Sequence, residues 1–227
     1  MIAEWINSTF FAFDHAILEF FHGLAEAAGG ILTPIAEFFA VIGDNGYFSF
    51  LLAFILLCFP KTRKIGLCVL FAIGFGALFT NVAIKNIVER PRPYAEGVES
   101  FFAWWNSVGA PQESEFSFPS GHTTAAMASM CALCIAAWRS KRWLVAPAAA
   151  YVILMGASRN YLMVHYPTDV IAGIIVGGIS AILSCLFISW VWKLVKKHSD
   201  KKLFAFALNF DIRHPFPKKE SDNSEEQ

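Results

Sequence analysis

The stretch SFPSGHTTAAMASM, residues 117–130, places a Pro-Ser-Gly-His cluster directly before a run of small and apolar residues. Ser120 is a helix-capping residue type, so we expect a helix to begin at Gly121 and to offer the free N–H groups of its first turn to an anion. Gly121 has no side chain and lets an anion approach the backbone. The surrounding run, 116–138, is uncharged enough for burial in lipid apart from His122. The stretch predicts an anion-binding helix start at one face of a membrane.

The composition of the chain is typical of a membrane protein. Of its 227 residues, 56% are hydrophobic and 16% are charged, which is too apolar for an ordinary soluble domain. The formal net charge is +0, so bulk electrostatics give no indication of nucleic-acid binding. We expect a membrane lipid as the binding partner, with no nucleic acid and no obligate protein partner.

Apolar runs long enough to span a bilayer set the predicted architecture. A span needs about 20 apolar residues. The candidate runs are 45–60, 65–84, 116–138, 143–158 and 170–192. The runs 45–60 and 143–158 are short, so their ends must use interfacial residues. The sequence predicts an all-α, polytopic membrane helix bundle with five transmembrane helices, in which residues 45–192 form the bundle.

Residues 1–44 are apolar but carry only acidic charges, with no Lys or Arg. No full span fits there comfortably, so we expect short interfacial or re-entrant helices broken near residues 29–34, and a sixth span stays open. Between residues 14 and 28, one helical stripe is apolar and a second is polar. The polar stripe consists of His15, Glu19, His22 and Glu26. We interpret it as a solvated face with i,i+4 pairs, and metal binding is the less favoured alternative.

The basic residues predict the orientation of the bundle. They lie in every second loop and after the last span, at Lys61, Arg63, Lys64, Arg139, Lys141, Arg142, Lys193, Lys196, Lys197, Lys201 and Lys202. The positive-inside bias makes these loops and the tail, residues 193–227, cytoplasmic. Residues 85–120 and 159–169 then lie on the outer side of a multi-pass protein of the plasma (inner) membrane.

The five cysteines, Cys58, Cys68, Cys131, Cys134 and Cys185, all lie inside apolar runs. The Cys131-x-x-Cys134 pair has the spacing of a redox or metal motif, but no further ligand type lies nearby. We interpret these residues as small core residues and expect no disulfide.

Three polar clusters far apart in the sequence converge on the outer side. They are KNIVERPRP (85–93), PSGH (119–122) and SRNYLMVHYPTD (158–169). Cations at membrane depth are costly unless they are paired, and few carboxylates lie beside these. Arg92 and Arg159 can each hold two phosphate oxygens, and Lys85 adds a point charge. The clusters therefore predict a phosphate site.

Two histidines complete the predicted site. Asp169 follows His165 by four residues, and Pro167 between them is suited to the start of a helix. The carboxylate can then orient one ring nitrogen and leave the other free to attack. His122, at the start of the other helix, can protonate a departing oxygen. One nucleophile and one acid around cations indicate phosphoryl transfer.

These motifs resemble those of a known family. The pattern Lys85-x6-Arg92-Pro93, Pro119-Ser120-Gly121-His122 and Ser158-Arg159-x5-His165-x3-Asp169 is similar to that of the type-2 phosphatidic acid phosphatase superfamily, which shares its site with vanadium haloperoxidases. The resemblance covers residues 45–190. It implies that His165 attacks phosphorus, Asp169 orients it and His122 protonates the leaving group. It also implies phosphate contacts from Lys85, Arg92, Ser120, Gly121 and Arg159, with no metal or cofactor.

Arg90, the aromatic loop 94–118 and two glycines lie outside these motifs. Arg90 either serves the second phosphate of a diphosphate or pairs with Glu89, and we favour the pairing. The aromatic loop 94–118 is either an interfacial lid beside the site or an anchor in the headgroup layer. Gly173 and Gly177 are expected to allow close helix packing.

The sequence therefore predicts a membrane lipid phosphatase that removes a terminal phosphate through a phosphohistidine. Undecaprenyl diphosphate is the favoured substrate, and phosphatidylglycerophosphate, phosphatidic acid and a soluble phosphoester are alternatives. Lipid phosphotransfer uses the same residues, and the motifs do not separate it from hydrolysis. A haloperoxidase fits the membrane spans less well. A non-catalytic lipid-binding or transport protein is disfavoured because costly charges at membrane depth usually serve a function.

Overall fold

A computed structural model describes residues 1–198 and 213, and every regular element in this part of the chain is helical. The elements are α1 (Ile2–Ala27), α2 (Thr33–Gly43), η1 (Asp44–Gly46), α3 (Tyr47–Leu57), α4 (Arg63–Ala77), the π-helical η2 (Leu78–Ile84), α5 (Lys85–Val88), η3 (Pro93–Ala95), α6 (Glu99–Ser107), α7 (Gly121–Ala137), η4 (Arg142–Leu144), α8 (Val145–Tyr161) and α9 (Pro167–Lys197). The all-α prediction is confirmed. Most of the predicted tail, 193–227, lies outside the described residues.

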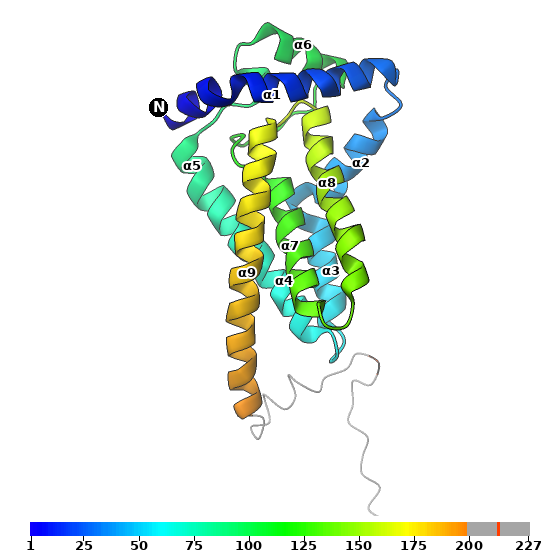
Figure 1. Ribbon diagram of the computed structural model, residues 1–227, viewed down its shortest axis with the longest axis vertical. Helices are drawn as coiled ribbons and strands as arrows, with labels where there is room; N and C mark the ends of the chain where they lie inside the picture. The colour runs from blue at the N-terminus through cyan, green and yellow to red at the C-terminus, as the bar shows by residue number, and fades with distance from the viewer. Residues whose placement is uncertain (199–212, 214–227) are drawn as a thin grey trace, which may run out of the picture.

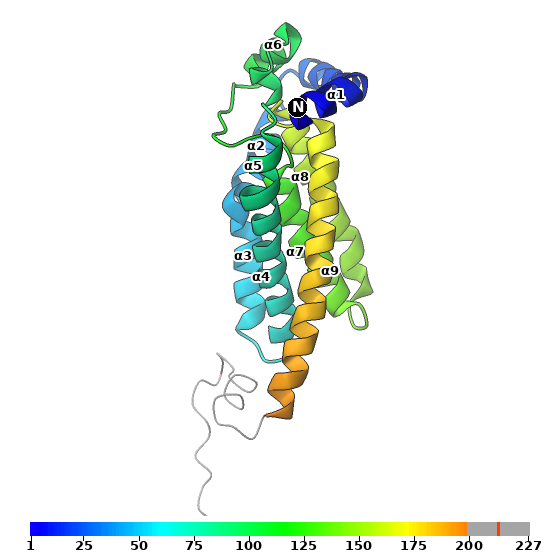
Figure 2. The same cartoon turned by 90° about the vertical axis from the view of Figure 1, so that its left-hand side faces the viewer.

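Helix α7 lies at the centre of the bundle, where it packs against α4, α8 and α9 (Figures 1 and 2). Two glycines of α9 allow its close approach to α7. A Cβ on Gly173 would stand 2.8 Å from the carbonyl oxygen of Ser120, and one on Gly177 would stand 2.6 Å from that of Thr124. Both distances are too short for a real side chain, so the predicted packing role of these glycines is confirmed.

The number of long apolar helices differs from the prediction. Within the described residues, three helical stretches are long and apolar enough to cross a membrane, namely Thr33–Leu57, Arg63–Ala95 and Pro167–Lys197. The predicted runs 116–138 and 143–158 form the shorter helices α7 and α8, each of 17 residues. The two helices are shorter than the predicted runs because polar residues come before them. Helix α7 begins only after the turn at Pro119 and Ser120, and α8 begins only after a basic loop.

The N-terminal boundary predicted at residue 44 falls inside the first apolar stretch. Helix α2 continues through η1 into α3, with a local kink where Asn45 and Gly46 adopt positive φ. The predicted break near residues 29–34 is confirmed, because α1 ends at Ala27 and α2 begins at Thr33. Pro34 lies in the first turn of α2, where proline costs no hydrogen bond. The stretch from Thr33 therefore belongs to the bundle.

Helix α1 lies across one end of the bundle, roughly perpendicular to the long helices, and α6 lies on its outer side (Figure 1). Its predicted polar stripe forms i,i+4 pairs, with 3.7 Å between His15 and Glu19 and 3.4 Å between His22 and Glu26. Both imidazoles also pack against the indole of Trp104 in α6. The stripe therefore joins α1 to the loop that carries α6.

The aromatic residues of loop 94–118 are divided between the protein interior and the surface. Phe101 and Trp105 are buried, and Tyr94 stacks on Trp105 with 4.5 Å between ring centroids. Phe102 is half exposed. The buried pair fixes this loop against α1 and the loop before α9, so the following residues 108–120 are held above the end of α7.

Candidate active site

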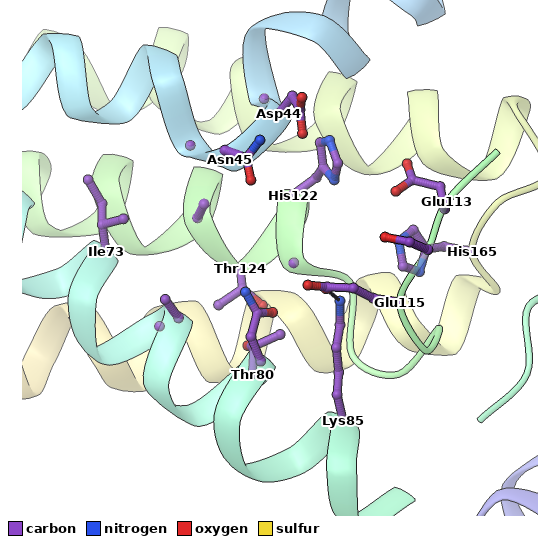
Figure 3. A pocket seen from close by; sticks show the side chains of 18 of the residues that line it. Asp44, Asn45, Ile73, Thr80, Lys85, Glu113, Glu115, His122, Thr124 and His165 are labelled. Atoms are coloured by element: carbon purple, nitrogen blue, oxygen red, sulfur yellow. Dashed lines mark hydrogen bonds and ion pairs between the residues drawn. The ribbon is translucent and has the colours of Figure 1, made fainter. Parts of the chain in front are cut away.

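The three predicted clusters meet in one cavity at the end of the bundle that α1 covers (Figure 3). The cavity has a volume of about 350 Å³. Its polar lining consists of Asp44, Asn45, Thr80, Asn81, Lys85, Arg92, Glu113, Ser114, Glu115, His122, Thr124 and His165, together with the backbone of Gly121. Of the predicted site residues, Arg159 and Asp169 stand behind this lining, and Ser120 is buried in a helix cap.

His165 lies in the short loop between α8 and α9, with its ring fixed on both sides. Its Nδ1 is 3.5 Å from Oδ2 of Asp169 and 3.4 Å from Oγ of Ser117, whereas its Nε2 is 3.3 Å from a terminal nitrogen of Arg92. An arginine N–H only donates, so Nε2 must accept and the ring proton belongs on Nδ1, facing Asp169. The nitrogen that faces the cavity is therefore the unprotonated one.

Burial keeps the His165 imidazole neutral. The side chain is 1% exposed. Burial lowers its pKa from 6.5 to about 3; the hydrogen bond to Asp169 opposes this shift, and the positive charge of Arg92 adds to it. Nε2 of the ring thus stays unprotonated across the physiological pH range.

Asp169 is held by the start of its own helix and by two other segments. Its Oδ2 accepts the backbone N–H of Tyr166 at 2.9 Å, which completes a capping box at the start of α9. The same oxygen accepts a hydrogen bond from Ser117. Oδ1 accepts from Arg90 at 2.6 Å. The sequence predicted the role of Asp169 but not the contribution of Ser117, which lies three residues before the PSGH cap.

His122 is the second residue of α7, directly after the predicted helix start. Ser120 caps the helix as expected, because its Oγ accepts from the backbone N–H of Thr123 at 3.4 Å. The imidazole hydrogen-bonds the backbone carbonyl of Ala40 and lies beside Gly43, where a Cβ would stand 3.0 Å from the ring. Helix α2 therefore orients this histidine toward the cavity that His165 also lines (Figure 3).

The three predicted phosphate-binding cations are buried around the two histidines. Lys85, Arg92 and Arg159 are 5%, 5% and 1% exposed, respectively. Arg92 is fixed by donating to the carbonyl oxygens of Glu115 at 2.8 Å and Val164 at 2.9 Å. The Nε of Arg159 has no hydrogen-bond partner within the described residues. An unpaired buried donor is costly, so Arg159 keeps hydrogen-bonding capacity for a ligand.

Two glutamates that the sequence analysis left in the aromatic loop lie among these cations. One carboxylate oxygen of Glu113 is 3.7 Å from Arg92 and the other is 3.5 Å from Arg159, while Glu115 contacts Lys85 (Figure 3). Glu113 and Glu115, called the acidic strap below, thus occupy positions suited to phosphate oxygens. Their position in the sequence, shortly before the PSGH motif, could have indicated this location, because the PSGH turn itself lies at the site.

The prediction that Arg90 pairs with Glu89 is wrong. Arg90 is 1% exposed and forms ion pairs with Asp169 at 2.6 Å and with Asp14 of α1 at 2.8 Å. The exposed Glu89 adopts a positive φ as the C-cap of α5, which turns the chain so that Arg90 enters the protein. The alternative, a contact to a second phosphate, is also disfavoured, because each guanidinium nitrogen of Arg90 already has a hydrogen-bond partner in the protein.

The chain is similar to several known proteins. The family model of the PAP2 superfamily matches residues 65–196. BcrC, an undecaprenyl-diphosphatase of Bacillus subtilis (strain 168), is 30% identical over 168 residues, which are 72% of this chain and 78% of that protein. An undecaprenyl-diphosphatase of Sulfolobus acidocaldarius is 28% identical over 130 residues, which are only 58% of its length.

Two solved structures share the fold. The crystal structure of LpxE from Aquifex aeolicus has a TM-score of 0.58 and 28% identity, over 74% of this chain and 93% of that one. A transmembrane PAP2 type phosphatidylglycerolphosphate phosphatase from Bacillus subtilis has a TM-score of 0.53 and 25% identity, over 81% of this chain and 96% of that one. The apolar helices and these relatives define a multi-pass membrane protein of the lipid phosphatase class. The chain belongs to the PAP2 superfamily.

Proposed function

We propose that this protein removes a terminal phosphate from a membrane lipid through a covalent phosphohistidine on His165. The observation that carries the proposal is the orientation of this ring, whose Nδ1 faces Asp169 at 3.5 Å while Nε2 faces the cation-lined cavity. A neutral imidazole fixed in this way is a nucleophile that needs no deprotonation.

In the first step, the Nε2 lone pair attacks phosphorus and the bond from phosphorus to the lipid-side oxygen breaks. Arg92 and Arg159 bind the equatorial oxygens and stabilise the charge that develops on them. The N–H groups at the start of α7, beginning at Gly121, and the ammonium of Lys85 serve the same oxygens. The imidazole ring becomes positively charged, and Asp169 stabilises that charge through Nδ1–H.

His122 serves as the acid and then the base. It lines the same cavity as His165, and a bound phosphate favours its charged form, so its proton can pass to the departing lipid-side oxygen. In the second step, it takes a proton from water while that water attacks the phosphohistidine. The products are inorganic phosphate and the dephosphorylated lipid, and both histidines return to their starting states.

The favoured substrate is a lipid diphosphate such as undecaprenyl diphosphate. Two relatives carry the name undecaprenyl-diphosphatase. The cavity of about 350 Å³ also offers Asn81 and Asn45 in addition to the groups that hold the transferred phosphate. These groups supply hydrogen bonds for a second phosphate next to the one that is transferred. Phosphatidylglycerophosphate and phosphatidic acid are the alternative substrates.

The site is proposed to open on the outer face of the plasma membrane. The loops at the opposite end of the bundle are the basic ones, which favours their location in the cytoplasm. A lipid carrier released on the outer leaflet would then meet the cavity directly, beneath α1 and the acidic strap.

The test is phosphate release by the detergent-purified protein, with chelator present, from undecaprenyl diphosphate, phosphatidylglycerophosphate and phosphatidic acid. We expect turnover to be highest on the diphosphate and to fall by about 10⁴-fold in His165→Ala, because the nucleophile is lost. His22→Ala, which changes a histidine of α1 outside the cavity, should keep wild-type turnover. Undiminished release by His165→Ala would refute the mechanism, and turnover of the glycerolipids alone would refute the diphosphate preference.

A further inference from the structure

A buried charge network connects α1 to the carboxylate that orients His165. Asp14, Arg90 and Asp169 are each 1% exposed or less. The guanidinium of Arg90 lies between the two carboxylates, with N–O distances of 2.8 Å to Asp14 and 2.6 Å to Asp169. Because each nitrogen of the Arg90 guanidinium already has a partner in the protein, the role of this network is not explained by phosphate binding.

The position of Arg90 is fixed from several directions. Its Nε donates to Oδ1 of Asn7 at 2.6 Å, and one terminal nitrogen donates to Oγ1 of Thr168 at 2.7 Å. Its guanidinium carbon lies 3.7 Å from the centroid of the Tyr166 ring. Only the side of Arg90 that faces Asp169 leads toward the site, and the opposite side is held by residues of α1.

Asp14 also holds the first turn of α9 directly. Its Oδ1 accepts the backbone N–H of Thr168 at 2.9 Å, and its Oδ2 accepts the Thr168 hydroxyl at 2.7 Å. That N–H belongs to the group at a helix start that has no partner inside the helix. A carboxylate from α1 therefore caps the helix turn that carries Asp169.

We infer that Asp14 is a positioning residue for the reaction, acting through Arg90 and Thr168 on the Asp169–His165 pair; this inference rests on the proposed phosphohistidine mechanism. Arg90 divides its positive charge between two carboxylates. Without Asp14, the whole charge acts on Asp169, which then stabilises a positively charged imidazole less well. Removing Asp14 also frees the first turn of α9, so the ring loses its alignment with phosphorus.

The test compares Asp14→Asn with Glu19→Gln in the full-length protein, using the best lipid substrate from the panel above. Both variants replace a carboxylate of α1 by its amide, but Glu19 is exposed and pairs only with His15 in the described structure. We expect Asp14→Asn to lower kcat by about 10- to 100-fold, the range known for residues that orient metal-binding histidines through hydrogen bonds. KM should stay unchanged, and Glu19→Gln should match wild type.

The inhibition constants of vanadate and inorganic phosphate show whether Asp14→Asn lowers kcat by misaligning His165 or only by reducing the amount of folded protein. Vanadate mimics the five-coordinate transition state only when it bonds to His165, so its inhibition constant should rise by the same factor as kcat falls. Inorganic phosphate, which contacts the cations alone, should inhibit as in wild type. A fall in Vmax with unchanged vanadate inhibition would mean a smaller active fraction and would overturn the inference, as would an unchanged kcat.

A second variant covers the case in which Asp14→Asn does not fold. Thr168→Val keeps both charges and the backbone hydrogen bond but removes the hydroxyl that joins Asp14 to Arg90. It should lower kcat by about three- to tenfold, again with weaker vanadate inhibition. Full turnover by Thr168→Val would count against the inference. If His165→Ala also retained turnover, the proposed mechanism would be wrong. If the Asp14 and Thr168 variants retained turnover but His165→Ala did not, only the inference about Asp14 would be wrong.

Discussion

Arg90 and Arg92 are two residues apart and are both buried, at 1% and 5% exposure, yet they belong to different parts of the molecule. Arg90 lies between two buried aspartates at 2.6 and 2.8 Å. Arg92 lines the cavity, and the carboxylate nearest to it belongs to Glu113 at 3.7 Å. Proline between the two arginines keeps the chain extended, so the side chains diverge.

The difference distinguishes two kinds of buried cation. Scaffold charges are paired with carboxylates inside the fold, and ligand charges keep hydrogen-bonding capacity for a bound phosphate. Arg90 has its compensating charges inside the fold, and we therefore assign it to positioning. Arg92 and Arg159 face a loosely held glutamate that a phosphate can replace. A buried cation with strong internal partners should affect stability when it is removed, whereas one with weak partners should affect substrate binding and turnover.

The largest effect on stability is expected from Arg90→Gln. It leaves the carboxylates of Asp14 and Asp169 buried without a cation, so the free energy of unfolding should fall by about 3–5 kcal/mol. Thermal unfolding in detergent measures this, and Arg139→Gln at the opposite end of the bundle is the matched control. Equal stability of the two variants would contradict the division into scaffold and ligand charges.

Arg159→Gln should produce the opposite pattern. Its nearest carboxylate is at 3.5 Å and its Nε has no partner within the described residues, so little stability is lost. We expect kcat/KM to fall by about 10²- to 10³-fold, because a donor to the transition-state oxygens is removed. Phosphate-release kinetics and thermal unfolding are measured on the same preparation. A destabilised variant with normal kcat/KM would place Arg159 with the scaffold.

The neutral His165 predicts a pH dependence of stability. Its pKa is 6.5 when unfolded and about 3 when folded, so below pH 6.5 the unfolded state binds the extra proton. Between pH 6.5 and about 3, the free energy of unfolding therefore falls by about 1.4 kcal/mol for each unit by which the pH is lowered. His165→Gln lacks this contribution, so the difference between the two proteins should change by about 2 kcal/mol between pH 6 and 4.5. If the unfolding free energies of wild type and His165→Gln changed equally with pH, burial would not lower the pKa of His165.

The smallest effect is expected from Glu113→Gln in the acidic strap. The carboxylate competes with phosphate for Arg92 and Arg159 at distances that give weak ion pairs. Removing its charge should lower KM and the phosphate inhibition constant by about three- to tenfold, or ~1 kcal/mol. Glu99→Gln, on the exposed side of α6, is the control. A higher KM would show that the strap helps to bind substrate.

Much of the candidate site could be predicted because its residues lie at helix starts and in short motifs. The cap at Ser120, the proline in the first turn of α9 and the spacing from His165 to Asp169 are local features, and local geometry follows from local sequence. The partners of Arg90 could not be predicted in the same way. Asp14 lies 76 residues away in the sequence, and the nearby Glu89 was a more obvious candidate.

A weaker signal for Asp14 was present in α1. Its buried face carries Ile6, Leu18 and Ala25, and Asp14 lies on the same face. A carboxylate on the packed side of a helix needs a partner in the bundle. The apolar stripe and the His/Glu stripe predicted between residues 14 and 28 did not include this buried face.

The sequence by itself determined the helical membrane class, the family and the local form of each motif, because composition, caps and residue spacing act over a few residues. The tertiary structure decided which charges compensate one another, since buried ion pairs depend on elements that meet only after folding. It placed Arg90 beside Asp14 of α1, and it brought the acidic strap into contact with Lys85, Arg92 and Arg159. The physical reason is desolvation. A charge that is buried without a partner costs free energy, so each buried charge is paired with a side chain or with the substrate.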